Sequence, residues 1–481
     1  MNYLDVLRLA APEAVLVVTA LVVLALGLAS TRALAVCSAV AAAGLLFASS
    51  AVLMLPLQAT LFNGMLVITP LTSLFKIVCL ALGFFTVIIA RQLHSRHHGE
   101  YLALLLLATV GLMLLVGSEE LLVIFIGLEL TGLSLYIMAA FDKTDIRSAE
   151  AGLKYFLFGS TASAFTLFGI SLIYGMTGTT GLAAIATKLG TMSPLLSAGI
   201  IMTLIGFAFK VAAAPFHLWA PDTYQGAPIP SAAFIASASK VASFVVLGKI
   251  VLVGFAPAQG AAGWHAMVAG WAPLLAVLAA LSILIGNLVA LAQSNVRRLL
   301  AYSAVAHAGY TLLGLIAGGR DGFSATLFYT TVYAFTLVGA FGVVALVRHE
   351  TGGDDFSHFS GLRARSPWLA GCMAVFMLSL AGIPPLGGFF GKFYLFSAAL
   401  QTGGNHGLLW LVALALFGSL ISFYYYLMVL KVIFIDDTAA QVSVFKPDFL
   451  QRASIILLAA IVLFLGVFPG GLVWKITNSL P

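Results

Sequence analysis

The sequence predicts an all-α polytopic membrane protein with about fourteen transmembrane helices. Of its 481 residues, 62% are hydrophobic and only 8% are charged. A soluble globular protein carries roughly 25% charged residues, so this composition favours lipid over water as the solvent. Apolar runs of about 20 residues, the length that crosses a bilayer as a helix, also follow one another along the whole chain.

Fourteen such runs can be delimited in the sequence. The predicted spans are residues 13–30, 33–54, 70–90, 101–117, 119–140, 148–175, 194–214, 228–253, 270–293, 297–317, 322–348, 366–400, 407–434 and 454–474. The segment 366–400 is too long for one straight span, and its centre reads Gly382-Ile383-Pro384-Pro385-Leu386-Gly387-Gly388. Because proline interrupts a helix, we predict a single crossing with a broken middle.

The basic residues between these spans predict the orientation of the chain. One set of alternate loops holds Arg32, Arg91, Arg96, Lys143, Arg147, Arg297, Arg298, Arg348, Arg363, Arg365, Lys431, Lys446 and Arg452. The other set holds Arg8, Lys188, Arg320 and Lys475. The positive-inside rule places the larger set in the cytoplasm. Both termini are therefore predicted on the periplasmic side.

Composition also argues against several function classes. The net charge is +6, but the basic residues are scattered through short loops and form no patch, which argues against nucleic-acid binding. The three cysteines, Cys37, Cys79 and Cys372, lie in apolar runs without a Cys-x-x-Cys spacing, which argues against iron–sulfur, zinc or disulfide sites. We expect no cofactor and no metal in this chain.

Among the ionisable residues inside predicted spans, five stand out. These five are the ones that are hardest to explain as interface residues: Glu129, Lys154, Lys210, Lys240 and Lys392. Each charge near the bilayer centre costs about 2.5–3.5 kcal/mol unless it is paired or hydrated. Internal ion pairs that hold the helices in register are one interpretation. A proton relay is the other, and it is favoured because Glu129 alone would have to serve four lysines. Lys76 and Lys249 lie near span ends and are expected to reach the interface.

Polar neighbours support hydration around some of these residues. Ser237, Lys240 and Ser243 recur on one stripe of a helix. Ser303, His307, Tyr310 and Thr311 form a similar patch on the span 297–317. For His307 both interpretations stay open, a buried structural histidine or a member of a proton relay.

Two proline breaks lie beside two of the lysines. Lys210 precedes Pro215 by five residues, and Lys392 follows Pro384 and Pro385. Unwound backbone inside a membrane is tolerated where it is buried or lines a water-filled cavity. The breaks fall in the seventh and twelfth spans, and an offset of five reverses the crossing direction, as in an inverted repeat. Two unrelated kinks are the alternative.

These breaks suggest a division of the chain into four parts. The expected parts are an N-terminal three-helix segment (1–99), a first five-helix repeat with an input half-channel (100–253), an inverted five-helix repeat with an output half-channel (254–435), and a C-terminal loop with the last helix (436–481).

The segment from Ala214 to Pro228 resembles a known family signature. It reads APFHLWAPD from Ala214 to Asp222 and YQGAP from Tyr224 to Pro228. This resembles the antiporter-like proton channel subunits of respiratory NADH–quinone oxidoreductase (complex I) and of multi-subunit Na⁺/H⁺ antiporters. The similarity extends to residues 127–130, 297–303 and 382–393, and it covers roughly residues 100–435. The YQGAP motif and Ala238-Ser239-Lys240 are similar to the N-subunit branch of that family, and the lysine at 392 differs from the middle subunit, which carries a glutamate there.

The resemblance implies roles for the buried residues. It implies that Glu129 and Lys210 form the pair gating the input half-channel, that Lys240 is the central relay and that Lys392 is the exit-side residue. Lys154, His217 and His307 would be accessory. Pro215, Pro384 and Pro385 would mark the broken helices. The relay would be driven by redox energy released in other subunits.

The resemblance also implies partners and a location. These are the other antiporter-like subunits and the small membrane subunits of complex I, in a bacterial inner membrane. FMN, iron–sulfur clusters and quinone would belong to partner subunits. Three alternatives remain: a subunit of a Na⁺/H⁺ antiporter without a redox partner, a structural membrane spacer that carries no protons, and a quinone-binding role for this chain alone.

Overall fold

A computed structural model describes residues 3–29, 34–91, 93, 97–190, 193–402, 407–437 and 447–480. The described chain is mostly helical and divides into two compact units, residues 1–210 with 226–259, and residues 211–225 with 260–480. Each unit is described by itself. Three basic residues that the orientation argument uses, Arg32, Arg96 and Lys446, lie outside the described residues.

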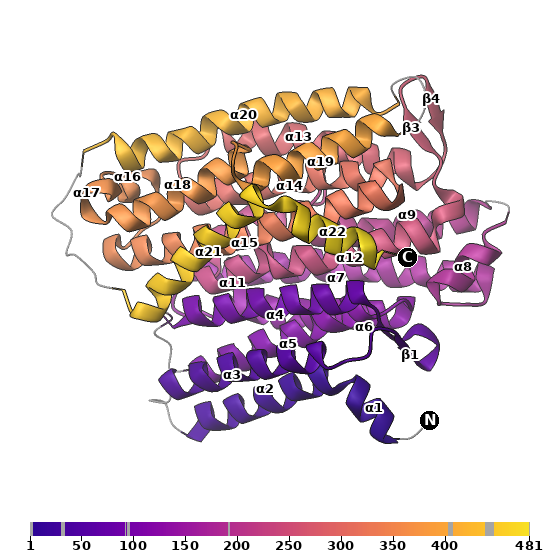
Figure 1. Cartoon of the computed structure of the whole chain (residues 1–481), viewed down its shortest axis with the longest axis horizontal. Coiled ribbons are helices and arrows are strands. Elements are labelled where there is room, and N and C mark those ends of the chain that lie inside the picture. The colour runs from indigo at the N-terminus through magenta and orange to yellow at the C-terminus, as the bar shows by residue number, and fades with distance from the viewer. Residues whose placement is uncertain are drawn as a thin grey trace. The chain divides into compact units, whose positions relative to one another are not determined.

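The first unit consists of helices and one small hairpin. Its elements are α1 (Tyr3–Leu9), α2 (Ala11–Ala29), α3 (Leu34–Leu53), β1 (Ala59–Leu61), a 3₁₀ turn (Phe62–Gly64), β2 (Leu66–Ile68), α4 (Pro70–Ala90), α5 (His98–Gly117), α6 (Leu121–Ala139), α7 (Ile146–Thr177), α8 (Leu182–Lys188), α9 (Pro194–Val211), α11 (Ile229–Ala236), α12 (Ala238–Lys249), a π-helix (Ile250–Gly254) and a 3₁₀ turn (Ala256–Ala258). Within this unit α2, α3, α4 and α5 pack side by side (Figure 1).

The second unit begins in the loop after α9. Its elements are α10 (Trp219–Gly226), β3 (Ala261–Gly263), β4 (Ala266–Val268), α13 (Trp271–Ala290), α14 (Val296–Ala317), α15 (Gly319–Thr351), α16 (Phe356–Phe359), α17 (Leu362–Arg365), α18 (Pro367–Ala381), α19 (Gly387–Gln401), α20 (Leu409–Phe434), α21 (Phe449–Val467) and α22 (Pro469–Ser479). At its centre lies α15, whose apolar 18-residue stretch is completely buried. This helix packs against α14, α18, α19, α21 and α22.

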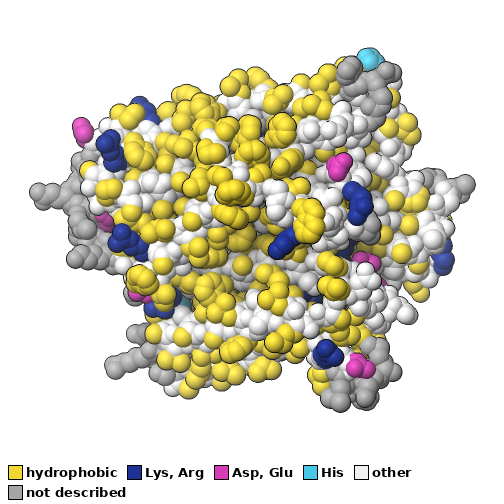
Figure 2. Space-filling model, in the orientation of Figure 1, with side chains coloured by type: hydrophobic (Ala, Val, Ile, Leu, Met, Phe, Trp, Pro, Cys, Tyr) yellow, Lys and Arg dark blue, Asp and Glu magenta, His cyan; other side chains and the backbone are white. Residues whose placement is uncertain are grey.

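The prediction of a polytopic helical membrane protein is confirmed. Thirteen of the described helices, with residues 229–254 counted as one, are long and apolar enough to cross a membrane. The predicted segment 366–400 is the pair α18 and α19, with a non-helical break between them. Figure 2 shows hydrophobic side chains over most of the viewed face, while charged side chains are few. Each antiparallel hairpin, β1–β2 and β3–β4, has strands of three residues, and neither was predicted.

The helix ends follow from local chemistry. Thr69 caps α4, because its hydroxyl accepts from the Thr72 backbone N–H at 3.2 Å and Pro70 occupies the first turn. Glu120, Asp145 and Asn295 accept backbone N–H groups at the starts of α6, α7 and α14. At the C-terminal end of α7, Gly178 takes the left-handed conformation (φ 64°) that a helix C-cap requires.

The eighth predicted span, 228–253, is not one continuous helix. Ser237 interrupts it with φ −116° and ψ −84°, between α11 and α12. Its hydroxyl donates to the Ala233 carbonyl at 2.6 Å, which satisfies one backbone acceptor beside the interruption. No proline or glycine marks this position, so helix-breaking residues alone did not predict it.

Lys76 and Lys249 are buried inside the first unit and do not reach the interface as expected. Lys76, on α4, is 1% exposed and its ammonium lies 2.6 Å from Glu13 on α2. Lys249, at the end of α12, donates to the Val116 carbonyl at 2.9 Å and lies 3.7 Å from Glu119. The sequence-based expectation failed because a residue near a helix end can be covered by neighbouring helices when an acidic partner is available.

A buried carboxylate outside the spans joins the start of α14 to the segment after α15. Asp354 binds Arg297, accepts from Asn295 at 2.9 Å and lies 3.4 Å from Arg348. Burial raises the pKa of Asp354, but Arg297, the Asn295 hydrogen bond and Arg348 outweigh burial, so the pKa is below its ordinary value. Folding is therefore coupled to the ionised form of this carboxylate.

We expect Asp354→Asn to lower the free energy of unfolding by about 3–5 kcal/mol, because it leaves the buried Arg297 charge without its partner. The ordinary pKa is about 3.9, and the folded-state pKa is lower. The stabilisation is therefore present above about pH 4 and is lost as the pH falls below that value. Thermal unfolding of the detergent-purified protein from neutral to acidic pH measures it. Asp355→Asn, at the exposed neighbour, is the matched control, and an equal loss in both variants would contradict the prediction.

Candidate functional site

A small cavity in the first unit brings Glu129 and Lys210 together. It is lined by residues of α6, α7 and α9, including Glu129, Ser163, Thr166 and Lys210, and has a volume of about 20 Å³. A volume of about 10–15 Å³ is enough for one water molecule. Lys210 is 5% exposed, whereas Glu129 is half-buried. The sequence therefore identified two residues that the fold places at one site.

Ser163 on α7 holds the carboxylate of Glu129. Its hydroxyl donates a hydrogen bond to Glu129 Oε1. Among the ion pairs of the described residues none joins Glu129 to Lys210, so the two charges face a shared cavity without direct contact. Ser163 was not predicted, although its place on the helix after Glu129 makes it a natural candidate for a hydroxyl donor.

Small residues bring the helices of this site close together. Gly169 on α7 lies against Gly199 and the Thr203 backbone on α9, so that a side chain at Gly169 would collide with that helix. Gly159 on α7 leaves room for the hydroxyl end of Tyr136. Tyr136 lines the cavity and packs edge-on against Tyr155 at 4.7 Å between ring centroids.

The break after α9 explains the position of Lys210. The helix ends at Val211, so Lys210 lies in its last turn, where a cation interacts favourably with the helix dipole. Ala212 has φ 59°, a left-handed conformation that ends the helix. The helix thus ends four residues before Pro215.

His217 follows Pro215 within the second unit. It is 6% exposed and packs edge-on against Tyr302, at 6.4 Å between ring centroids. Its Nδ1 has no hydrogen-bond partner among the described side chains and backbone groups.

Lys240 is buried near the start of α12, 2% exposed. Of the predicted polar stripe, Ser237 lies at the interruption before α12 and Ser243 lies within the helix. Both hydroxyls donate to carbonyls of their own chain segment, Ala233 and Ser239, at 2.6 and 2.7 Å. Lys240 thus lies beside a helix interruption, as Lys210 and Lys392 do.

Lys392 on α19 lies against the other proline break. It is 5% exposed and its ammonium donates to the Ala381 carbonyl at 3.1 Å, at the last residue of α18. The ammonium also lies 5.3 Å from the centroid of the Tyr310 ring, within the range of a cation–π interaction. The break exposes carbonyls that have no partner within the helix, and the lysine supplies a donor for one of them.

His307 is the centre of a hydroxyl network within the second unit. Its Nδ1 lies 2.5 Å from the Tyr329 hydroxyl and its Nε2 lies 3.0 Å from the Tyr426 hydroxyl. Tyr426 also bonds Ser303. A neutral imidazole donates from one ring nitrogen and accepts at the other. The hydrogen bonds of His307 to Tyr329 on α15 and to Tyr426 on α20 can therefore reverse their directions together. The two tyrosines were not predicted.

Lys154 differs from the expectation of a buried, unpaired lysine. Its side chain is 38% exposed, and its ammonium lies 2.6 Å from Glu150 one turn earlier on α7. The premise that Glu129 must serve four lysines is therefore wrong. The spacing of four residues favours this pair on any helix, so the sequence contained the signal.

The chain is similar to proteins of known family across nearly its whole length. Residues 118–422 match a family described as NADH:quinone oxidoreductase/Mrp antiporter, TM. NADH-quinone oxidoreductase subunit N 2 of Acidobacterium capsulatum is 46% identical over 484 aligned residues, which cover 97% of this chain and 98% of that protein. Subunit N of Trichlorobacter lovleyi is 41% identical over 417 residues, covering 85% and 83% of the two chains.

Solved structures with the same fold include subunits of large membrane complexes. A chain of respiratory complex I from Thermus thermophilus with bound aureothin has a TM-score of 0.81 and 32% identity, covering 96% of this chain and 98% of that one. A chain of the Mrp complex from a Dietzia species has a TM-score of 0.84 at 22% identity, covering 98% and 96%. The second similarity concerns the fold alone.

The close approach at Gly388 provides a test of the break beside Lys392. A Cβ at Gly388 would collide with the Ser379 backbone carbonyl, whereas a Cβ at Gly371 on α18 would meet no atom within 4 Å. We therefore expect Gly388→Ala to lower the unfolding temperature and the amount of protein in the membrane. Gly371→Ala should leave both unchanged or slightly raised, because alanine is the better helix former. Equal behaviour of the two variants would show that the break is not tightly packed.

Proposed function

The chain belongs to the family of membrane subunits of NADH:quinone oxidoreductases and Mrp antiporters, and from that premise we propose that it translocates protons across the membrane. The proposed setting is a respiratory NADH–quinone oxidoreductase in a bacterial inner membrane. Electron transfer from NADH to quinone would take place in other subunits, which would hold FMN and the iron–sulfur clusters. Other antiporter-like subunits and small membrane subunits would be the partners.

The observation that carries this proposal is the shared cavity of Glu129 and Lys210. Ionisable groups inside membrane proteins are costly and are most often part of ion or proton pathways. Here a carboxylate and an ammonium face a space large enough for about one water molecule, and Ser163 orients the carboxylate. This arrangement suits a pair whose interaction can change without large movement of the helices.

The proposed mechanism is electrostatic. A nearby carboxylate stabilises the charged form of a lysine. An event elsewhere in the complex that draws Glu129 away from Lys210 would favour release of the lysine proton. Lys240 would be the central relay, Lys392 the exit-side residue, and His217 and His307 accessory groups. The two hydroxyl contacts of His307 support a relay role, because a proton accepted at one ring nitrogen can leave from the other.

Lys154 remains a proposed accessory residue, but it differs from the others because it is not buried. Because it pairs with Glu150 on a half-exposed part of α7, it would act at the surface of the chain. The inverted repeats, the input and output half-channels of residues 100–253 and 254–435, and the periplasmic placement of both termini remain parts of the same proposal.

Two other functions are distinguishable from this one. A Na⁺/H⁺ antiporter subunit would share the fold, but the relatives at 46% and 41% identity bear the name NADH-quinone oxidoreductase subunit N, which favours the redox-coupled complex. A structural spacer would retain ion pairs such as Lys76–Glu13 but has no use for a shared cavity between unpaired charges. A quinone site within this chain has no specific support.

We expect Lys240→Ala to abolish or strongly reduce NADH-driven proton pumping while the complex still assembles. NADH–ferricyanide activity should be retained, because that reaction would not involve this subunit. Inverted membrane vesicles with a pH-sensitive dye measure the pumping. Lys431→Ala removes an exposed lysine at the end of α20 and should leave pumping unchanged. Normal pumping by the assembled Lys240→Ala complex would exclude the relay role of Lys240.

A further inference from the structure

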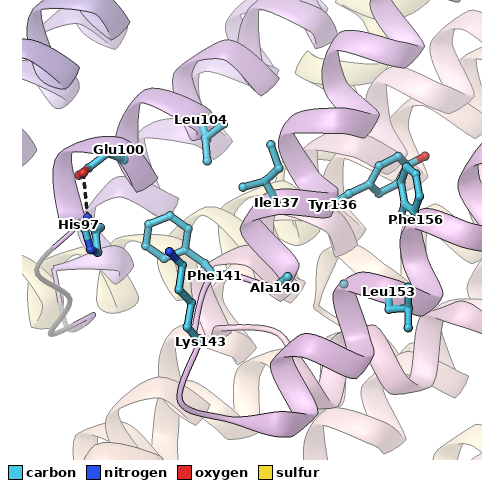
Figure 3. Close-up of a pocket in the computed structure, with 11 residues that line it drawn as sticks. His97, Glu100, Leu104, Tyr136, Ile137, Ala140, Phe141, Lys143, Leu153 and Phe156 are labelled. Atoms are coloured by element: carbon cyan, nitrogen blue, oxygen red, sulfur yellow. Dashed lines mark hydrogen bonds and ion pairs between the residues drawn. The ribbon is translucent and has the colours of Figure 1, made fainter.

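A second pocket in the first unit has no role in the proposed proton path. It lies among α5, α6 and α7 and has a volume of about 620 Å³, within the ~300–1,000 Å³ typical of ligand sites. Its walls are largely apolar and include Leu104, Ile137, Leu153 and Phe156. Figure 3 shows these side chains around the open space, with Tyr136 and Phe156 on the side away from His97 and Glu100.

The polar groups of this pocket gather at one end. His97, Glu100 and Lys143 line it there, and in Figure 3 the side chain of Lys143 extends from the loop after α6 toward Phe141. His97 Nδ1 lies 2.9 Å from Glu100 Oε1. Glu100 Oε2 is buried and has no hydrogen-bond partner among the described groups. A buried carboxylate oxygen without a donor is unfavourable, so the pocket suits a ligand that brings a cationic donor.

The apolar walls suit an acyl chain. Ile137, Leu153 and Phe156 are 53%, 58% and 44% exposed, and they belong to helices long and apolar enough to lie in a bilayer. An acyl chain from the surrounding lipid can therefore enter the pocket from the side. Its headgroup would then lie at the end of the helices, where His97, Glu100 and Lys143 are found.

We propose that this pocket binds one phospholipid with an ethanolamine headgroup. Its ammonium donates to Glu100 Oε2, its phosphate accepts from Lys143, and one acyl chain lies along Leu104, Ile137, Leu153 and Phe156. A choline headgroup has a cation but no N–H donor, and a glycerol headgroup has O–H donors but no cation, so neither offers Glu100 both a hydrogen bond and a compensating charge. Tyr136 lines both this pocket and the cavity of Glu129 and Lys210, so the bound lipid would contact one wall of that site. The proposal does not depend on proton transfer.

A photoreactive lipid tests this site in the assembled complex. The complex is reconstituted into vesicles that contain phosphatidylethanolamine with a diazirine on one acyl chain, irradiated, and digested for peptide mass spectrometry. We expect label on residues of the pocket wall in clear excess over Leu416 and Leu420, exposed apolar residues of α20. The choline analogue should label the wall about tenfold less, because one hydrogen bond to a charged group corresponds roughly to that factor in affinity.

Three variants separate the headgroup from the acyl chain. Glu100→Gln should reduce labelling by the ethanolamine analogue to the level of the choline analogue. Leu153→Trp should fill the pocket and abolish labelling by both analogues. Asp321→Asn, which removes an exposed carboxylate elsewhere, should change neither. Equal labelling by the two analogues would overturn the headgroup assignment. Labelling no greater than on α20, or cross-links from the pocket wall to another subunit, would overturn the lipid site.

Discussion

The interior of this protein is governed by the cost of holding charges and open backbone groups away from water. Each unit consists of apolar helices, yet buried lysines lie within them. The structure compensates them with groups that the helices themselves supply. Lys249 uses the Val116 carbonyl at the end of α5, and Lys392 uses the Ala381 carbonyl at the end of α18. A helix end and a buried lysine thus satisfy each other, since free carbonyls need donors and an ammonium provides them.

This principle separates the lysines into two groups. Lys76 and Lys249 have acidic partners at 2.6 and 3.7 Å, and these contacts join α4 to α2 and α12 to the segment before α6. Lys210, Lys240 and Lys392 each lie beside a helix interruption, and Lys392 donates to a carbonyl that the interruption exposes. The first group fixes helices in register. The lysines of the second group lie beside interruptions, where an ammonium can exchange one hydrogen-bond partner for another. We assign proton transfer to this group.

Much of the fold could be predicted from the sequence because its main determinant is local. A run of apolar residues is sufficient to identify a span, and proline identified both breaks beside Lys210 and Lys392. The interruption at Ser237 was missed because no helix-breaking residue marks it. The partner of Lys76 could not be predicted either, since Glu13 lies far away in the sequence and only tertiary packing brings the two together. By contrast, the Glu150–Lys154 pair was readable from its spacing.

Some residues of the candidate site could likewise be predicted from the sequence, and others could not. Glu129, Lys210, Lys240 and Lys392 could be found because a charge in an apolar helix is conspicuous. Ser163, Tyr329 and Tyr426 could not, because hydroxyl groups are common in such helices and their function depends on geometry. The glycines that bring α7 to α9 and make room for Tyr136 are equally inconspicuous in a sequence with 47 glycines.

The separation of the lysines into two groups is the central claim, and protons pumped per NADH oxidised, normalised to assembled complex, test it most directly. Lys210→Met and Lys76→Met would be compared in the same vesicles. The account predicts that Lys210→Met assembles normally and loses pumping. It predicts that Lys76→Met reduces the amount of complex, because Glu13 loses its partner, while each assembled complex pumps normally. Normal pumping by Lys210→Met, or lost pumping by a fully assembled Lys76→Met complex, would contradict this division.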